Sequence, residues 1–248
     1  MSRPATARLF FALELPLPLR EALAAWALEA SRDAAAADRS EREQARRAPS
    51  GGRGAPVAHR GQHPEVGAGR RLAARRRSKQ LSMRLIEAES MHLTLSFMGS
   101  VPVEHVDPLA SVVASLQLSQ GGEAALGAPL WLPTRRPRAL AVEVHDLSGA
   151  IADAQRLLLD SLHTSGLARR DPSHGGAGRR RPLRPHVTVA RLRAGAAPGQ
   201  RTLPPTPQRT FPIGAVLLYR SWLTVDGASY EALAASARPE GRSVRGGA

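Results

Sequence analysis

The pattern of hydrophobic positions along this chain predicts a mixture of short strands and amphipathic helices. The run Leu9–Leu13 has the length of a buried strand, and Pro16 and Pro18 end it. Pro18 can occupy the first turn of a helix, where its missing N–H costs nothing. Apolar residues then recur at helical spacing, at Leu19, Leu23, Trp26 and Ala27. The chain therefore opens with a strand followed by a helix.

Regular patterns resume after residue 80 and continue to about residue 233. We expect strands near residues 83–86, 92–98, 124–132, 139–144, 186–192, 213–219 and 223–233. Helices are expected over 103–118 and 147–162. The second helix is well defined because one of its faces carries Ile151, Ala154, Leu158 and Leu162.

Residues 32–80 show almost no apolar periodicity and are rich in Arg, Ala, Gly, Pro and Ser. Such a segment buries too little apolar surface to offset its ordering entropy, so it is predicted to be a disordered basic insertion. It holds 13 basic and five acidic residues, more than half of the chain's net charge. With an irregular loop at 167–182 and a disordered tail at 239–248, the prediction is a single bilobal domain over residues 1–238.

Composition narrows the chemistry. The net charge of +14 favours binding of a polyanion such as RNA. A GC-biased genome, which enriches arginine, would give the same charge without any binding role. The absence of cysteine excludes a disulfide framework, a thiolate metal site and a cysteine nucleophile. There is neither an apolar run of membrane-spanning length nor a signal-peptide pattern, so we expect a cytoplasmic protein without a membrane partner.

The order of elements repeats. A strand, a helix and an irregular stretch lead to His92-Leu93-Thr94-Leu95, and the same series leads to His186-Val187-Thr188-Val189. The two tetrads are 94 residues apart. Such a duplication suggests two lobes related by a pseudo-two-fold axis, with a shared cleft.

Each tetrad suits phosphodiester chemistry. Side chains alternate in a strand, so histidine and threonine share one face while the aliphatic residues anchor the other. With a pKa near ~6.5, one imidazole can be neutral and accept a proton while the other is protonated and donates one. The hydroxyls of Thr94 and Thr188 can donate hydrogen bonds to phosphate oxygens.

These segments resemble the two-histidine (2H) phosphoesterase superfamily, and within it the RNA 2',3'-cyclic phosphodiesterases, the 2'-5' RNA ligase (LigT/ThpR-like) family with its paired HxTx motifs. The resemblance is carried by Arg8–Leu13, by Glu89–Gly99 around the first tetrad, by Arg184–Arg191 around the second, and by Leu218–Ser221. The insertion at 32–80 and the long stretch before His186 depart from the usual pattern.

The resemblance implies an α+β fold with two pseudo-symmetric lobes of antiparallel sheet, outer helices and a central cleft. It implies hydrolysis of RNA 2',3'-cyclic phosphate ends to 2'-phosphomonoesters, in RNA processing, with 2'-5' RNA ligase activity in some members. His92 would donate a proton to the leaving 3'-oxygen and His186 would accept one from water, while Thr94 and Thr188 hold the phosphate. No metal or cofactor is implied, and we expect a monomer.

Four further residues are candidates for substrate contact: Arg184, Arg191, Phe11 and Tyr219. Arg184 shares the face of His186, whereas Arg191 has the opposite parity and needs a twist or bulge to reach the cleft. An aromatic ring among Phe10, Phe11 and Phe97 could stack on a base. Two alternatives stay open: a two-histidine enzyme for a small cyclic nucleotide or ADP-ribose cyclic phosphate, and a non-catalytic RNA-binding module.

Overall fold

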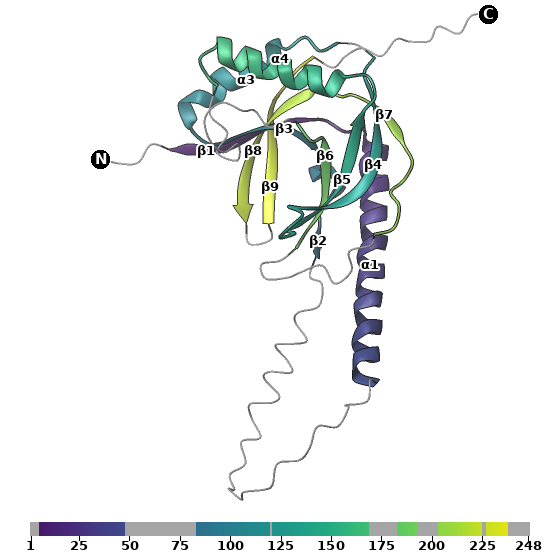
Figure 1. Ribbon diagram of the computed structural model, residues 1–248. Coiled ribbons are helices and arrows are strands. Elements are labelled where there is room, and N and C mark those ends of the chain that lie inside the picture. The colour runs from purple at the N-terminus through teal and green to yellow at the C-terminus, as the bar shows by residue number, and fades with distance from the viewer. Residues whose placement is uncertain are drawn as a thin grey trace, which may run out of the picture.

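The computed structural model describes residues 5–47, 83–119, 121–168, 183–192, 203–224 and 227–237. Its centre is a curled, antiparallel sheet of nine strands (Figure 1). The strands are β1 (Thr6–Leu13), β2 (Met83–Leu85), β3 (Leu93–Pro102), β4 (Glu123–Leu132), β5 (Ala139–Asp146), β6 (His186–Leu192), β7 (Thr210–Pro212), β8 (Val216–Thr224) and β9 (Gly227–Ala235). The helices are α1 (Leu17–Arg47), α3 (Val106–Ser115) and α4 (Ala150–Thr164), with short 3-10 turns η1 (Ala88–Ser90) and η2 (Val103–His105).

The strand order is β7-β4-β5-β6-β3-β1-β8-β9, and β2 pairs separately with β6. We call β1, β3, β8 and β9 the first lobe, and β2, β4, β5, β6 and β7 the second lobe. Each tetrad strand therefore lies at the inner edge of its own lobe, next to the strand that begins the repeat. The expected fold class, two pseudo-symmetric lobes of antiparallel sheet with outer helices, is confirmed. The lobes are halves of one continuous sheet.

The lobes meet along a very short seam. Over the described lengths of β3 and β6 the only registered pair is Leu93 with Val187, the aliphatic residue between histidine and threonine in each tetrad. Both side chains are fully buried. Because the strands separate on either side of this pair, the sheet opens into a cleft at the point where the two tetrads lie.

The helices bury the faces that the sequence predicts. Leu19, Leu23, Trp26 and Ala27 of α1 are in the core, and so are Ile151, Ala154, Leu158 and Leu162 of α4. In α1 the Trp26 indole N–H donates a 2.9 Å hydrogen bond to the carbonyl oxygen of Pro205. Helices α3 and α4 pack side by side over the sheet, while α1 lies against β2 and β6 (Figure 1). Within the described ranges, no helix is both long enough and apolar enough to cross a bilayer.

One boundary is corrected. The helix α1 continues to Arg47, so residues 32–47 are helical although we predicted them to belong to the disordered insertion. This segment lacks an apolar face, but it is rich in Ala, Glu, Gln and Arg, which have high intrinsic helix propensity. Extending an existing helix also avoids the cost of nucleation. Residues 48–80 of the insertion, 169–182 of the loop and the tail 239–248 lie outside the described residues.

Candidate active site

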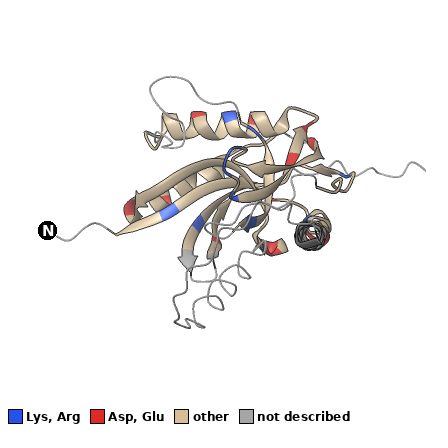
Figure 2. Cartoon of the chain, turned by 60° about the horizontal axis from the view of Figure 1, so that its bottom comes forward, with Lys and Arg blue, Asp and Glu red and all other residues tan. Residues whose placement is uncertain are grey.

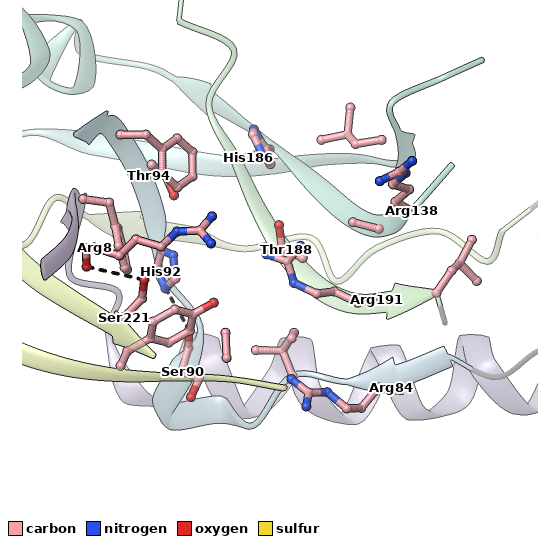
Figure 3. Close-up of a pocket in the computed structure, with 18 of the residues that line it drawn as sticks. Arg8, Arg84, Ser90, His92, Thr94, Arg138, His186, Thr188, Arg191 and Ser221 are labelled. Atoms are coloured by element: carbon pink, nitrogen blue, oxygen red, sulfur yellow. Dashed lines mark hydrogen bonds between the residues drawn. The ribbon is translucent and has the colours of Figure 1, made fainter. Parts of the chain in front are cut away.

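A cavity of about 1000 Å³ lies in the cleft, and both lobes line it. Its lining includes all four polar residues of the tetrads, which are His92, Thr94, His186 and Thr188 (Figure 3). Antiparallel pairing about Leu93 and Val187 brings His92 opposite Thr188 and Thr94 opposite His186. Each histidine therefore faces the threonine of the other lobe, as pseudo-two-fold symmetry requires.

The two imidazoles are oriented in the same way. Nδ1 of His92 lies 2.8 Å from the carbonyl oxygen of Ser90, and Nδ1 of His186 lies 2.8 Å from the carbonyl oxygen of Arg184. A carbonyl oxygen can only accept, so Nδ1 carries the hydrogen in both rings. Nε2 is then the atom of each ring that is available to gain or lose a proton.

The surroundings of His92 shift the pKa of its imidazole strongly. The pKa of His92 is lowered to about 4, mainly by burial and also by the charges of Arg191 and His186, while the hydrogen bond to Ser90 opposes the shift. The ring lies among aromatic side chains, with its centroid 4.8 Å from that of Phe10 and 5.1 Å from that of Tyr230. In the unliganded cleft at neutral pH, His92 is therefore neutral and its Nε2 is an acceptor.

A bulge follows the threonine in both tetrads. On β3, Leu95 has no partner between the pairs Phe11–Ser96 and Ala12–Thr94. On β6, Val189 has none between the pairs Leu140–Ala190 and Ala141–Thr188. An extra residue shifts the alternation of side chains by one position.

The two bulges bring equivalent residues into the cleft. Phe97 and Arg191, each three positions after its threonine, both line the cavity. This explains how Arg191 reaches the cleft despite its opposite parity in the sequence.

The cavity lining is cationic: among the described residues it holds Arg8, Arg84, Arg138 and Arg191 and no acidic residue. Charges are paired elsewhere, as on the outer helix α4, where Arg156 lies 3.2 Å from Asp153 and segments of both signs are visible (Figure 2). In the cleft, Arg191 reaches back toward Thr188, and Arg84 and Arg138 lie on either side of it (Figure 3). An anionic ligand fits this lining.

Three of the further candidates lie outside the cavity lining. Arg184 lies 3.5 Å from the carboxylate of Glu143, and its carbonyl, not its guanidinium, serves His186. Tyr219 stacks behind Phe10 at 5.2 Å, and burial raises its pKa. The expectation for Phe11 is wrong: its side chain is fully buried in the core, and Phe10, on the opposite face of β1, lines the cavity instead.

Several lining residues were not found from the sequence. Arg84, Arg138 and Tyr230 reach the cleft through pairings between distant segments, which no local pattern indicates. Phe10 and Phe97 were considered for base stacking, but their place in the cleft depends on the register of β1 and β3. Among the described residues, no cluster of three or more His, Asp or Glu side chains could hold a metal ion.

Comparisons with known proteins support the fold through structure only. No protein-family model and no curated protein matches the sequence. The structure is similar to TT0787 of Thermus thermophilus, with 20% identity, a TM-score of 0.59 and coverage of 95% of this chain and 99% of the other. It is also similar to E. coli LigT complexed with 3'-AMP, with 21% identity, a TM-score of 0.56 and coverage of 93% and 97%.

A third similar structure, a phosphoesterase, has 19% identity, a TM-score of 0.56 and coverage of 92% and 96%. LigT structures with ATP and with NADP+ also match. The LigT-like fold that the sequence resemblance implies is thus confirmed.

Proposed function

We propose that this chain hydrolyses 2',3'-cyclic phosphate ends of RNA to 2'-phosphomonoesters by acid–base catalysis between His92 and His186. One observation carries the proposal: two imidazoles from equivalent strands have Nδ1 fixed by a backbone carbonyl, which leaves both Nε2 atoms for one cationic cleft. The LigT-like fold and the nucleotides present in the LigT complexes support a nucleotide substrate.

In the proposed reaction, Nε2 of His186 accepts a proton from water and the water oxygen attacks phosphorus. The bond from phosphorus to the 3'-oxygen breaks, and protonated His92 donates its Nε2 proton to that oxygen. The product carries a 2'-phosphate and a free 3'-hydroxyl. Proton exchange with solvent then restores both rings. Each positioned transfer contributes roughly 10²–10⁴ in rate.

The low pKa of His92 requires that substrate binding supply the conditions for its protonation. A phosphate anion beside the ring stabilises the imidazolium and raises its pKa, offsetting both burial and the charge of Arg191. His92 would therefore become an acid only when a phosphate is bound. This couples protonation of the general acid to occupancy of the cleft.

The remaining lining residues fit the same substrate. The hydroxyls of Thr94 and Thr188 would donate to the non-bridging oxygens, and Arg191 would neutralise charge that builds there. The rings of Phe10, Phe97 and Tyr230 line the side of His92 and offer a surface for the ribose and base. We also propose that the protein is a monomer and is located in the cytoplasm.

To test the proposal, an oligonucleotide ending in a 2',3'-cyclic phosphate is incubated with the protein in the presence of EDTA. The product is identified by its chromatographic retention time or its NMR spectrum. We expect a 2'-phosphate, and loss of turnover in both His92→Ala and His186→Ala. His163→Ala, at an exposed position on α4, is the matched control and should keep full activity. A 3'-phosphate product, or turnover that survives in either cleft variant, would reject the assignment.

A further inference from the structure

Among the described residues, three of the four arginines that line the cleft belong to the second lobe, and the proposed reaction uses only one of these three. Arg191 reaches toward Thr188 and so toward the reacting phosphate, whereas Arg84 and Arg138 lie beside it (Figure 3). The cavity of about 1000 Å³ is also at the upper end of the range for sites that hold whole small molecules. The reacting phosphate therefore does not account for the part of the cleft that Arg84 and Arg138 line.

The sheet fixes the positions of these arginines. Arg84 on β2 pairs directly with Arg191 on β6. The backbone of Arg138 is held on both sides: its N–H donates to the carbonyl oxygen of Leu132, and its carbonyl oxygen accepts from the N–H of Leu192, both at 2.8 Å. The residue after Arg138, Ala139, pairs with Arg191 from the other side. Arg84 on β2 and Arg138, the last residue before β5, therefore approach Arg191 from positions that backbone hydrogen bonds fix.

This arrangement is electrostatically unfavourable without a ligand. Like charges directly opposite each other on paired strands destabilise a sheet, and Arg84 and Arg191 are such a pair. Within the described part of the chain no acidic side chain lines the cavity, and neither Arg84 nor Arg138 makes an ion pair. Arg184, only seven positions from Arg191, does have a carboxylate partner in Glu143. A bound anion would offset the repulsion at Arg84 and Arg191.

We infer that Arg84 and Arg138 form a second anion subsite beside Arg191, which binds a second phosphate group of the substrate. The inference rests on the proposed function in taking the reacting phosphate to lie between the two histidines. Two substrates share the required chemistry: an RNA chain, whose next phosphodiester lies on the 5' side of the terminal nucleoside, and a dinucleotide-like molecule with a pyrophosphate. The subsite selects for such substrates against a cyclic mononucleotide.

The test is the preference for a substrate with further phosphate, measured as its kcat/KM divided by the kcat/KM of a reference substrate that carries only the cyclic phosphate. The reference substrate is adenosine 2',3'-cyclic phosphate. The extended substrates, which carry further phosphate besides the cyclic one, are the dinucleotide ApA with the same cyclic end and ADP-ribose 1'',2''-cyclic phosphate. We expect Arg84→Gln and Arg138→Gln each to lower the preference about tenfold, as loss of a charged hydrogen bond would. The extended substrate whose kcat/KM falls more in the variants identifies the source of the phosphate group that the subsite binds.

Arg136→Gln is the matched control, because Arg136 is an exposed arginine of the same β4–β5 loop that does not line the cavity. It should leave the ratio unchanged. Equal losses on the reference and the extended substrates would overturn the inference, and so would a natural protein with no preference for the extended substrates.

A binding measurement separates this inference from the proposed function. Adenosine 3',5'-bisphosphate and 3'-AMP are titrated calorimetrically into the protein and the same variants, without any turnover. Tighter binding of the bisphosphate that depends on Arg84 and Arg138 supports the subsite even if no cyclic phosphate is hydrolysed. Equal affinity for the two ligands would overturn the subsite, whatever the outcome of the activity assay.

Discussion

The two lobes share one backbone plan and differ in the side chains attached to it. In each lobe a histidine is tied through Nδ1 to a carbonyl two residues earlier, and a threonine and a bulge follow it. The equivalent positions after the bulge hold Phe97 in the first lobe and Arg191 in the second. Their strand partners are Phe10 and Ala139. The first lobe thus presents aromatic rings together with the single arginine Arg8, whereas the second lobe presents Arg84, Arg138 and Arg191 among the described residues.

This difference indicates how a symmetric frame can perform a directional reaction. Symmetry supplies two equivalent histidines in one cleft, which are the two proton-transfer groups in the reaction that we propose. The asymmetric side chains surround His92 with aromatic rings and line the second lobe's part of the cleft with arginines. We expect variants of the shared frame to have the largest effects on activity, and variants of the unshared positions to have smaller and more selective effects.

The largest effect should come from the shared histidines acting as a unit. His92→Ala and His186→Ala should each lower kcat by about 10³, because each removes one positioned proton transfer. The double variant should lose little more than either single variant, since the two transfers belong to one reaction. Single-turnover rates measure this. Losses that multiply in the double variant would mean that the two rings act in separate steps.

The next largest effect on activity should come from removing the positive charge of Arg191 in the second lobe. Arg191→Met should lower kcat/KM by about 10², because a cation beside the developing phosphate charge is lost from a partly desolvated site. It should also raise the pKa of His92, since Arg191 helps to lower it. Steady-state kinetics measures the change in kcat/KM, and NMR titration of the imidazole measures the change in the pKa of His92. Arg135→Met, at an exposed position in the β4–β5 loop, is the control, and an unchanged His92 titration in Arg191→Met would contradict the account.

The burial of His92 should also appear as a pH dependence of stability. The unfolded chain binds a proton at this ring near pH 6.5, whereas the folded chain does so only at about 4. The contribution of His92 to the free energy of unfolding is therefore fully present above pH 6.5. It is lost as the pH drops toward 4, and the loss amounts to roughly 3 kcal/mol.

Urea unfolding of the natural protein and of His92→Gln at a series of pH values measures the effect. The free energy of unfolding of the natural protein should fall more steeply between pH 6.5 and 4. Parallel curves for the two proteins would show that His92 is not held neutral by the fold.

The smallest effect should come from the aromatic wall. Phe97→Ala should raise KM for a base-bearing substrate about tenfold while changing kcat little, since stacking on a base contributes about 1–3 kcal/mol. Its side chain is 50% exposed, so the melting temperature should hardly change. Trp222→Ala, also an exposed aromatic residue of the first lobe but outside the cavity lining, should leave KM unchanged. Equal KM changes in both variants would remove the argument for stacking.

The sequence was most informative where the signal is local. Each tetrad carries its own alternation of polar and aliphatic residues, so the pairing of histidine with threonine on one face follows from the strand alone. The buried faces of α1 and α4 were predicted for the same reason, because helical spacing is visible within a few turns. The repeat itself predicted that the two strands belong together.

The sequence was least informative where long-range pairing decides the outcome. Arg191 reaches the cleft because of a bulge at Val189, and a bulge has no reliable signature in a single strand. Phe10 and Phe11 are adjacent, and only the register of β1 between β3 and β8 decides which of them faces the cleft. Residues 32–47 are helical although they show no apolar periodicity, because intrinsic helix propensity, which leaves no periodic pattern, favours the helix there.

The central claim is that both histidines act on one phosphorus atom, and a crystal structure with a vanadate complex of a nucleoside tests it most directly. The vanadate is a mimic of the five-coordinate phosphorus. We predict one vanadium centre in the cleft, with an oxygen about 3 Å from Nε2 of His92 and another, on the opposite side, about 3 Å from Nε2 of His186. A vanadate held by the arginines with either ring outside hydrogen-bonding distance would contradict the account.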